Sequence, residues 1–270
     1  DTLFDGLRKG GKPYALLLAY TDLAHSAAAL RLSNPKLLAE VSRSQLLQRV
    51  EGGDAALRAL IDKGYLESYT VEVERLKTCT ATETLGMRPL NEHQQRALAQ
   101  IHASFDKHDI TLLHGVTSSG KTEVYMKLIE ETLAQGKQVL YMLPEIALTT
   151  QITTRLGRVF GDKMGVYHSK FPDAERVELW QRQLTEKAFP LILGVRSSLF
   201  LPFQNLGLII VDEEHETSYK QQDPAPRYHA RDAALILAQQ LGAKVLLGTA
   251  TPSLESFYKA RQGRYGLVEM

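Results

Sequence analysis

The chain has 270 residues, of which 44% are hydrophobic and 23% charged, and its formal net charge is +1. That length allows two domains. The balanced charge excludes a protein that attracts nucleic acid through a strongly positive net charge, so any nucleic-acid site must be a local patch. No run reaches the ~18 apolar residues that a membrane span needs, and the N-terminus lacks a secretory signal, so we expect a cytoplasmic protein without a membrane partner. The single cysteine, Cys79, excludes an intrachain disulfide and a cysteine-based zinc cluster. Because the chain begins with Asp1, we expect a piece of a longer protein.

The first part of the chain, residues 12–78, is predicted to be mainly helical after a tail over residues 1–11. The expected elements are a helix from Lys12 to about Arg31, a helix capped by Ser42 or Ser44, a helix restarted after Gly52-Gly53-Asp54, and an alternating strand over 65–76. A helix, a turn, a helix and a strand outline a winged-helix domain. A small helical packing domain is the alternative that this pattern leaves open.

The second part, residues 90–270, has a different pattern and follows a predicted linker over 79–89 that is rich in Thr, Gly and Pro. Short apolar runs alternate with helix-compatible stretches. Runs such as LGLIIV are apolar on both faces, as in a parallel sheet covered by helices, which predicts a doubly wound α/β domain. The expected strands are 110–115, 138–143, 164–168, 191–195, 206–212 and 244–249, and the expected helices are 121–135, 146–160, 173–185 and 229–241.

A phosphate loop is predicted at GVTSSGKT, which fits G-x-x-x-x-G-K-[ST] between an apolar strand and a helix. The two glycines allow the backbone to curl so that successive N–H groups face phosphate oxygens, and the helix N-terminus adds partial positive charge. We expect Lys121 to bind the β- and γ-phosphates and the Thr122 hydroxyl to ligate Mg²⁺. The expected nucleotide-binding residues are Gly115, Val116, Thr117, Ser118, Ser119, Gly120, Lys121 and Thr122.

An acidic box, residues 212–215, follows the run LGLIIV directly. Carboxylates at the carboxyl end of a parallel strand lie at the same edge of the sheet as a phosphate loop. We expect Asp212 to hold Mg²⁺ and Glu213 to orient the attacking water, so these two residues and Lys121 form the expected catalytic set. For Glu214 and His215 the sequence allows two roles: they couple the nucleotide site to the next strand, or they form a hydrogen-bonded pair at the surface.

A threonine turn, residues 248–252, ends the run KVLLGTATPS. Hydroxyl groups at this edge would connect the acidic box to a neighbouring surface, so Thr249 and Thr251 join Glu214 and His215 as expected coupling residues. The alternative is an ordinary strand-to-loop turn.

The segments GVTSSGKT, DEEH and GTATPS resemble motifs I, II and III of superfamily 2 helicases. Four further segments narrow the resemblance to one bacterial family, that of primosomal protein N′ (PriA): LPEIALTTQ, GVRSSLFLPF, SYKQQDPAPRYHARD and LNEHQ. In the first part of the chain, the segments SRSQLLQ and ALIDKGYLE resemble the winged-helix domain of that family. Ser118 and Val195 replace a glycine and a threonine that are common in that family. The resemblance covers roughly residues 12–270 and implies a winged-helix domain followed by a RecA-like lobe.

The family resemblance implies an ATP-dependent 3′–5′ DNA helicase of replication restart, with ATP or ADP and Mg²⁺ as cofactors and no zinc in this part. The implied partners are single-stranded and forked DNA, single-strand DNA-binding protein and other primosome proteins of the bacterial cytoplasm. Gln94 is implied to read adenine. The implied DNA contacts are Thr149, Gln151, Arg196, Ser197, Tyr219, Lys220, Arg227 and Tyr228. For each tyrosine, burial at the edge of the lobe is the alternative.

Residues 90–270 leave room for one RecA-like lobe, whereas helicases of this kind bind ATP between two. The arginine fingers of a second lobe would lie beyond Met270, so we expect this chain to hydrolyse ATP feebly and not to unwind DNA. Arg227 and Arg231 are expected to face DNA or the sheet edge. Two other hypotheses remain: a double-stranded DNA translocase subunit, and a non-catalytic module in which nucleotide is a structural ligand.

Overall fold

A computed structural model describes residues 7–24, 41–69, 86–87, 89–116, 119–168 and 171–270. The chain divides into two compact units, residues 1–73 and 74–270. The first unit has one buried apolar cluster of its own and the second has two, so each unit is described by itself. Across the described ranges, no helix combines the length and the apolar composition needed to cross a membrane.

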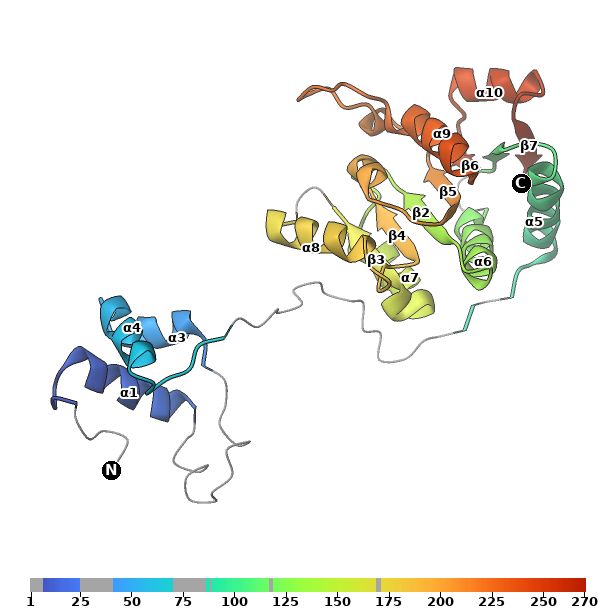
Figure 1. Ribbon diagram of the computed structural model, residues 1–270. Helices are drawn as coiled ribbons and strands as arrows, with labels where there is room; N and C mark the ends of the chain where they lie inside the picture. Colours follow the sequence, from blue (N-terminus) through green and yellow to red (C-terminus); the bar gives the residue numbers. More distant parts are fainter. Residues whose placement is uncertain (1–6, 25–40, 70–85, 88, 117–118, 169–170) are drawn as a thin grey trace. The chain divides into compact units, whose positions relative to one another are not determined.

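The first unit contains the helices α1 (Lys12–Leu23), α3 (Arg43–Arg49) and α4 (Asp54–Asp62), all visible in Figure 1. Leucines on these three helices, Leu16, Leu46, Leu57 and Leu60, form the core of the unit. Ser42 caps α3 in a reciprocal capping box with Gln45, which confirms one of the two predicted caps.

Two predictions for this unit reach beyond the part of the chain that is described. The predicted first helix ran to about Arg31; α1 ends at Leu23, and residues 25–40 lie outside the described ranges. The strand predicted over 65–76 is not present in its described part, because residues 65–66 form a bend and residues 67–69 are irregular; residues 70–76 lie outside the described ranges.

The second unit is built on a seven-stranded sheet with the order β3-β4-β2-β5-β6-β1-β7, and every neighbouring pair runs parallel. The strands are β1 (Ile110–His114), β2 (Gln138–Met142), β3 (Met164–Tyr167), β4 (Leu191–Gly194), β5 (Leu206–Asp212), β6 (Lys244–Thr249) and β7 (Gly266–Glu269). The first six match the predicted runs to within a residue. Central strands such as β2 are buried along their whole length, which is why their sequences are apolar on both faces.

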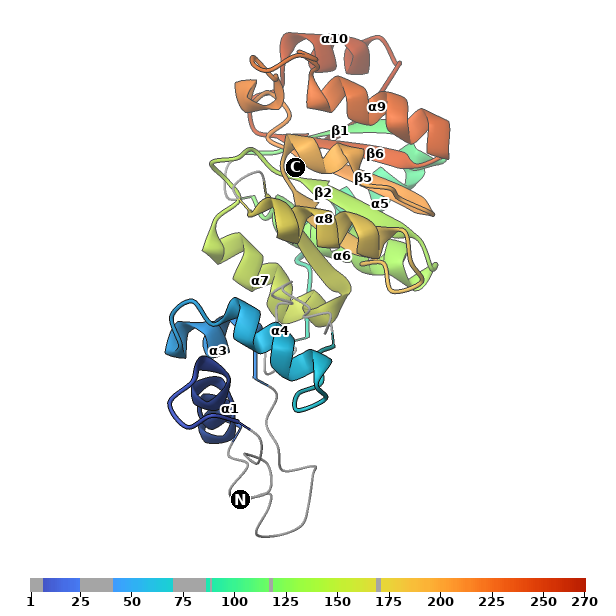
Figure 2. The ribbon, with the colours of Figure 1, turned by 60° about the vertical axis from the view of Figure 1, so that its left-hand side comes forward.

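Helices cover both faces of this sheet, as Figures 1 and 2 show. One buried cluster joins the sheet to α5 (Glu92–Phe105), α6 (Lys121–Ala134) and α7 (Thr150–Phe160). The other joins it to α8 (Asp173–Gln183), α9 (Ala230–Leu241) and α10 (Leu254–Arg261). Neighbouring leucines of one strand face opposite layers: Leu112 lies in the second cluster and Leu113 in the first. The predicted doubly wound α/β fold is confirmed.

The predicted helix over 146–160 was wrong at its start. Residues 145–147 form a turn in which the Ala147 N–H donates to the Pro144 carbonyl, and α7 begins at Thr150 after an extended Thr149. The helices α5 and α10 and the strand β7 were not among the predicted elements.

Candidate active site

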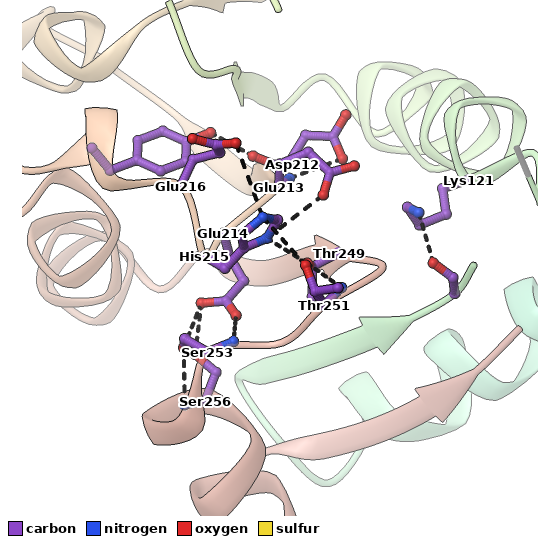
Figure 3. A network of polar contacts seen from close by, with 12 residues as sticks. Lys121, Asp212, Glu213, Glu214, His215, Glu216, Thr249, Thr251, Ser253 and Ser256 are labelled. Carbon is purple, nitrogen blue, oxygen red and sulfur yellow. Dashed lines mark hydrogen bonds and ion pairs between the residues drawn. The ribbon is translucent and has the colours of Figure 1, made fainter. Parts of the chain in front are cut away.

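Three predicted segments meet at one edge of the sheet because β1, β6 and β5 are neighbours in it. The phosphate loop follows β1, the threonine turn begins at the end of β6, and the acidic box begins at the end of β5. Figure 3 shows Lys121 on one side of this edge and the acidic box on the other, with Thr249 and Thr251 beside the box.

Lys121 is the first residue of α6 and is only 8% exposed. Its ammonium group donates to the carbonyl oxygens of Gly115, at 2.8 Å, and Val116, at 3.4 Å. The cation is therefore held inside the loop by the loop's own carbonyls. A phosphate that binds here must compete with them, and it gains a charge-assisted contact in return.

Gly120 and Gln94 fit together at the base of the loop. Gly120 has a φ of 89°, in the left-handed region that favours glycine, and a side-chain carbon there would overlap the Gln94 amide. That amide donates to the Gly120 carbonyl at 3.4 Å, while the Gln94 side-chain oxygen accepts from the Asn91 N–H at 2.9 Å in the capping box of α5. Gln94 thus joins the start of α5 to the phosphate loop.

The loop also contains a buried donor without a protein acceptor. The Ser119 hydroxyl is buried and has no hydrogen-bond partner among the described residues. Thr122, half-buried, lies in the first turn of α6 beside the free N–H groups of the helix. An unpaired hydroxyl at a helix N-terminus with an adjacent ammonium group has the composition of an anion site.

Asp212 is held by two tyrosines that the sequence reasoning missed. The Tyr125 hydroxyl donates to Oδ1 and the Tyr141 hydroxyl to Oδ2, each at 3.1 Å, and the Glu213 N–H donates to Oδ1 at 3.1 Å. Burial and the Glu213 charge raise the pKa of Asp212 from 3.8 to about 6, against the effect of the tyrosine hydrogen bonds. Burial, then the charge of Asp212, raises the pKa of both tyrosines well above its usual value, so both remain protonated donors.

Tyr219 also helps to hold Asp212, so its predicted role as a DNA contact was wrong. It is fully buried, and its hydroxyl donates to the main-chain carbonyls of Asp212, at 2.6 Å, and Met142, at 3.1 Å. A side chain without exposed surface offers no stacking platform, so the alternative of burial holds for this residue.

Glu213 adopts an unusual backbone conformation. Its φ is 45°, and it is the single non-glycine residue with positive φ among the described residues. Such a conformation costs on the order of 1 kcal/mol or more and persists where the surroundings impose it. Here the carbonyl of Glu213 accepts from the Glu216 N–H at 2.9 Å, and its side chain lies 3.7 Å from His215 Nδ1.

Glu214 is not a surface residue, so the option of a surface pair is wrong for it. It is fully buried and its carboxylate accepts four hydrogen bonds: from Arg231 Nη1 at 2.8 Å, from the Ser253 N–H and hydroxyl at 2.6 and 3.0 Å, and from the Ser256 hydroxyl at 2.9 Å. Arg231 is itself buried, which contradicts the expectation that it faces DNA or the sheet edge. Glu214 therefore ties the acidic box to α9 and α10, as Figure 3 shows for the two serines.

His215 connects the acidic box to the threonine turn. Its Nδ1 lies 2.8 Å from the Thr249 hydroxyl and its Nε2 lies 3.3 Å from the Thr251 hydroxyl, both within hydrogen-bond range. The Thr251 N–H donates to the Thr249 hydroxyl at 3.0 Å. The structure thus brings together the four residues that were grouped as coupling residues.

The predicted DNA contacts are spread over three surface segments. Thr149 and Gln151 are exposed at the start of α7. Arg196 is half-buried, donates a hydrogen bond to the Ser218 carbonyl at 3.1 Å and forms an ion pair with the Glu145 carboxylate at 3.7 Å. The Ser197 hydroxyl is buried without a hydrogen-bond partner among the described residues. These residues lie at the carboxyl ends of β2 and β4, which are neighbours in the sheet.

The remaining contacts lie on an arm, residues 220–229, that projects from the lobe between β5 and α9 (Figure 1). Lys220 and His229 pair at its base, and the Lys220 ammonium donates to the Arg227 carbonyl at 2.5 Å. Arg227 is exposed, and Tyr228 packs edge-on against Phe200 with 5.0 Å between ring centroids. Phe200, 60% exposed, was missed, although it stands in the segment RSSLF that the sequence reasoning singled out.

Comparison with known proteins assigns the family. The model described as "DEAD/DEAH box helicase" matches residues 91–259, more than half of the chain. The chain belongs to the DEAD/DEAH box helicase family. A second model, described as "Winged helix domain, PriA helicase, Bacteroidota", matches residues 1–73 and confirms the predicted winged-helix domain.

The relatives of this helicase-family chain include the replication restart protein PriA of Bacillus subtilis (strain 168), which is 40% identical over 237 residues, 86% of this chain and 29% of the relative. PriA of Haemophilus influenzae is 44% identical over 218 residues, 77% of this chain and 29% of the relative. The resemblance to PriA is therefore confirmed, and the chain spans less than a third of these relatives' length. Among solved structures, the DUF1998 helicase MrfA is 20% identical and aligns with a TM-score of 0.48 over 68% of this chain and 31% of that one.

Membership of the helicase family implies a bound nucleotide, and the residues at this edge fit one. The described residues include no cluster of three or more His, Cys, Asp or Glu that could hold a metal ion. Mg²⁺ does not require such a cluster, because it is usually held by one or two carboxylates together with phosphates and water. Asp212 at the end of β5 and Thr122 after the loop match that kind of site.

Proposed function

We propose that this chain is the winged-helix and ATP-binding part of an ATP-dependent 3′–5′ DNA helicase of replication restart. The observation that carries the proposal is the shared sheet edge, where a phosphate loop with a buried Lys121 lies near carboxylates at the end of β5. The similarity to PriA over 86% of the chain supports the restart role.

In this proposal the nucleotide is ATP or ADP with Mg²⁺, and each residue of the site contacts a different part of it. Lys121 leaves the Gly115 carbonyl for the β- and γ-phosphates, and the Gln94 amide leaves the Gly120 carbonyl to read the adenine. Thr122 and Asp212 hold Mg²⁺, which neutralises phosphate charge when bound. Glu213 orients the water that attacks the terminal phosphate.

Single-stranded or forked DNA is the proposed partner, bound along the exposed segments at the carboxyl ends of β2 and β4 and the arm 220–229. Single-strand binding needs cations, backbone donors and stacking surfaces. Arg196 and Arg227 supply charge, and Tyr228 with Phe200 supplies an aromatic surface. The family resemblance adds single-strand DNA-binding protein, other primosome proteins and a bacterial cytoplasmic location to the proposal, and the relatives named replication restart protein PriA support a role in restart.

The domain boundaries belong to the proposal as well: a tail over 1–11, a winged helix over 12–78, a linker over 79–89 and a RecA-like lobe over 90–270. The two compact units and the winged-helix match over 1–73 support this division. Limited proteolysis is expected to cut first within about 79–92, and a first cut elsewhere in the lobe would contradict this division.

Calorimetry with Mg²⁺ and a non-hydrolysable ATP analogue tests the nucleotide site. Lys121→Ala is expected to weaken binding by more than about 100-fold, because it removes the cation from the phosphates. Lys127→Ala is the matched control, because Lys127 lies on the same helix but is paired with Glu130 at the surface. Equal affinity of Lys121→Ala and the unchanged chain would remove the basis of the proposal.

Two competing functions are separated by DNA-binding and turnover measurements. Preference for single-stranded or forked DNA over blunt duplex in fluorescence anisotropy supports the helicase, and preference for duplex supports a double-strand translocase. Nucleotide binding without any DNA-dependent turnover, even when the chain is part of its full-length protein, supports a non-catalytic module.

A further inference from the structure

The carboxylate of Asp212 is fixed by hydroxyl groups from outside the acidic box. Tyr125 comes from α6, directly after the phosphate loop, and Tyr141 comes from β2. Both side chains are completely buried, and each hydroxyl lies 3.1 Å from a different oxygen of Asp212. The two oxygens of one carboxylate are therefore held separately, by two different elements.

The hydrogen bonds leave one acceptor position on Asp212. An ionised carboxylate offers about four lone-pair positions, two on each oxygen. Among the described residues, Oδ1 accepts from Tyr125 and from the Glu213 N–H, and Oδ2 accepts from Tyr141. The position that remains is on Oδ2, so Asp212 can offer a single further contact, to a cation or to a water bound to one.

Packing prevents the two tyrosines from turning away. Their rings meet edge to face, with 5.7 Å between centroids and an interplanar angle of 73°. The Tyr125 hydroxyl occupies the space beside Gly248, where any side-chain carbon would overlap it. From the opposite face of the sheet, Tyr219 donates to the Asp212 main-chain carbonyl at 2.6 Å. The strand end and its carboxylate are thus held from both layers.

We propose that Tyr125 and Tyr141 are positioning residues that aim Oδ2 of Asp212 at the magnesium ion of the bound nucleotide. The inference rests on the proposed nucleotide function and adds two residues to it. Mg²⁺ requires a nearly ideal octahedral arrangement of its ligands. A carboxylate that is already oriented meets this requirement without losing rotational freedom when the ion binds.

The test removes one hydroxyl at a time and keeps the ring, in Tyr125→Phe and Tyr141→Phe. Mg²⁺ affinity is measured by calorimetry on the chain saturated with a non-hydrolysable ATP analogue, and analogue affinity is measured separately in EDTA. Each variant is expected to bind Mg²⁺ on the order of tenfold more weakly, because loss of a hydrogen bond to a metal ligand typically has that effect. Analogue binding in EDTA is expected to stay unchanged, whereas the melting temperature is expected to fall slightly, because the buried Asp212 carboxylate loses one hydrogen bond in each variant.

Two controls distinguish positioning from packing. Tyr265→Phe alters a buried tyrosine beside the edge strand β7 and should leave Mg²⁺ affinity unchanged. In an Asp212→Asn background, Tyr125→Phe should cause no further loss, because the group that it orients is gone. A further loss in that background would show that the hydroxyl acts through packing and would overturn the inference.

The outcomes also separate this inference from the proposed function. If the unchanged chain binds no nucleotide with Mg²⁺, the proposed function fails and the inference falls with it. If the unchanged chain binds and both phenylalanine variants keep its Mg²⁺ affinity, the inference alone is overturned.

Discussion

The acidic box and the phosphate loop, on the two sides of the sheet edge, differ in how completely their polar groups are hydrogen-bonded before a ligand binds. On the acidic side, Asp212 and Glu214 accept hydrogen bonds from tyrosines, serines, an arginine and the backbone. On the phosphate-loop side, the Lys121 ammonium is bonded to carbonyls of its own loop, and the buried Ser119 hydroxyl has no hydrogen-bond partner among the described residues. One side is assembled before a ligand arrives, whereas the other must exchange internal contacts for phosphate contacts.

This difference separates stability from binding. A substitution on the acidic side that removes the partner of a buried charge is expensive for the folded state, whereas one that removes the buried charge itself is not. Substitutions in the loop remove contacts that form fully only with phosphate, so they should affect binding far more than folding.

The largest expected effect on stability is that of Arg231→Ala. It leaves the fully buried Glu214 carboxylate without its cation, and breaking a buried pair in this way typically costs about 3–5 kcal/mol. Urea unfolding at neutral pH measures the change. Arg227→Ala is the matched control, since its side chain is 68% exposed and should change stability by less than about 0.5 kcal/mol. Similar small changes for both arginines would show that the acidic side is not preassembled.

A smaller, pH-dependent effect is expected for Asp212→Asn. The folded state raises the pKa of Asp212 from 3.8 to about 6, so it binds this proton more tightly than the unfolded chain does. The charged carboxylate therefore lowers stability as pH rises through this range. Without Mg²⁺, the asparagine variant should be more stable by about 1–2 kcal/mol at pH 8, reduced from the full shift because Asp212 is half-buried.

The advantage of that variant should shrink as pH falls toward 4, where both forms of the site are neutral. Thermal melting between pH 4 and 8 measures it. A stability difference that does not change with pH would mean that Asp212 titrates normally in the folded protein.

The smallest expected effect on stability is that of Lys121→Ala in the absence of nucleotide. The hydrogen bonds that it removes are to neutral carbonyls, and losing them is offset by releasing a nearly buried ammonium group, so we expect a change of about 1 kcal/mol or less. The same variant should lose nucleotide binding. A loss of stability as large as that of Arg231→Ala would contradict the contrast between the two sides.

The sequence predicted the sheet well where burial imposes a pattern. Strands β1 to β6 were visible because each is a short apolar run. The strand β7 is a four-residue edge strand whose Gly266 and Glu269 interrupt the run, and α10 is short, so neither gave a clear periodic signal. The phosphate loop and the acidic box could be placed at one edge because parallel strands end together.

The partners of the acidic side could not be predicted in the same way. Tyr125 and Tyr141 are 87 and 71 residues from Asp212 in the chain, and their contact depends on the order of strands in the sheet. Tyr219 stands in a segment of aromatic and cationic residues, which favoured a DNA contact. Its burial follows from the packing of the strand ends, which the local sequence does not encode.

The left-handed backbone of Glu213 has a consequence for anyone who engineers this lobe for thermal stability. A glycine at this position would relieve the strained φ of 45°, so a search for stabilising substitutions would select it. The gain would remove the carboxylate proposed to orient the attacking water. Position 213 is therefore one where optimising the fold and keeping the chemistry demand different residues, a conflict that is common at active sites.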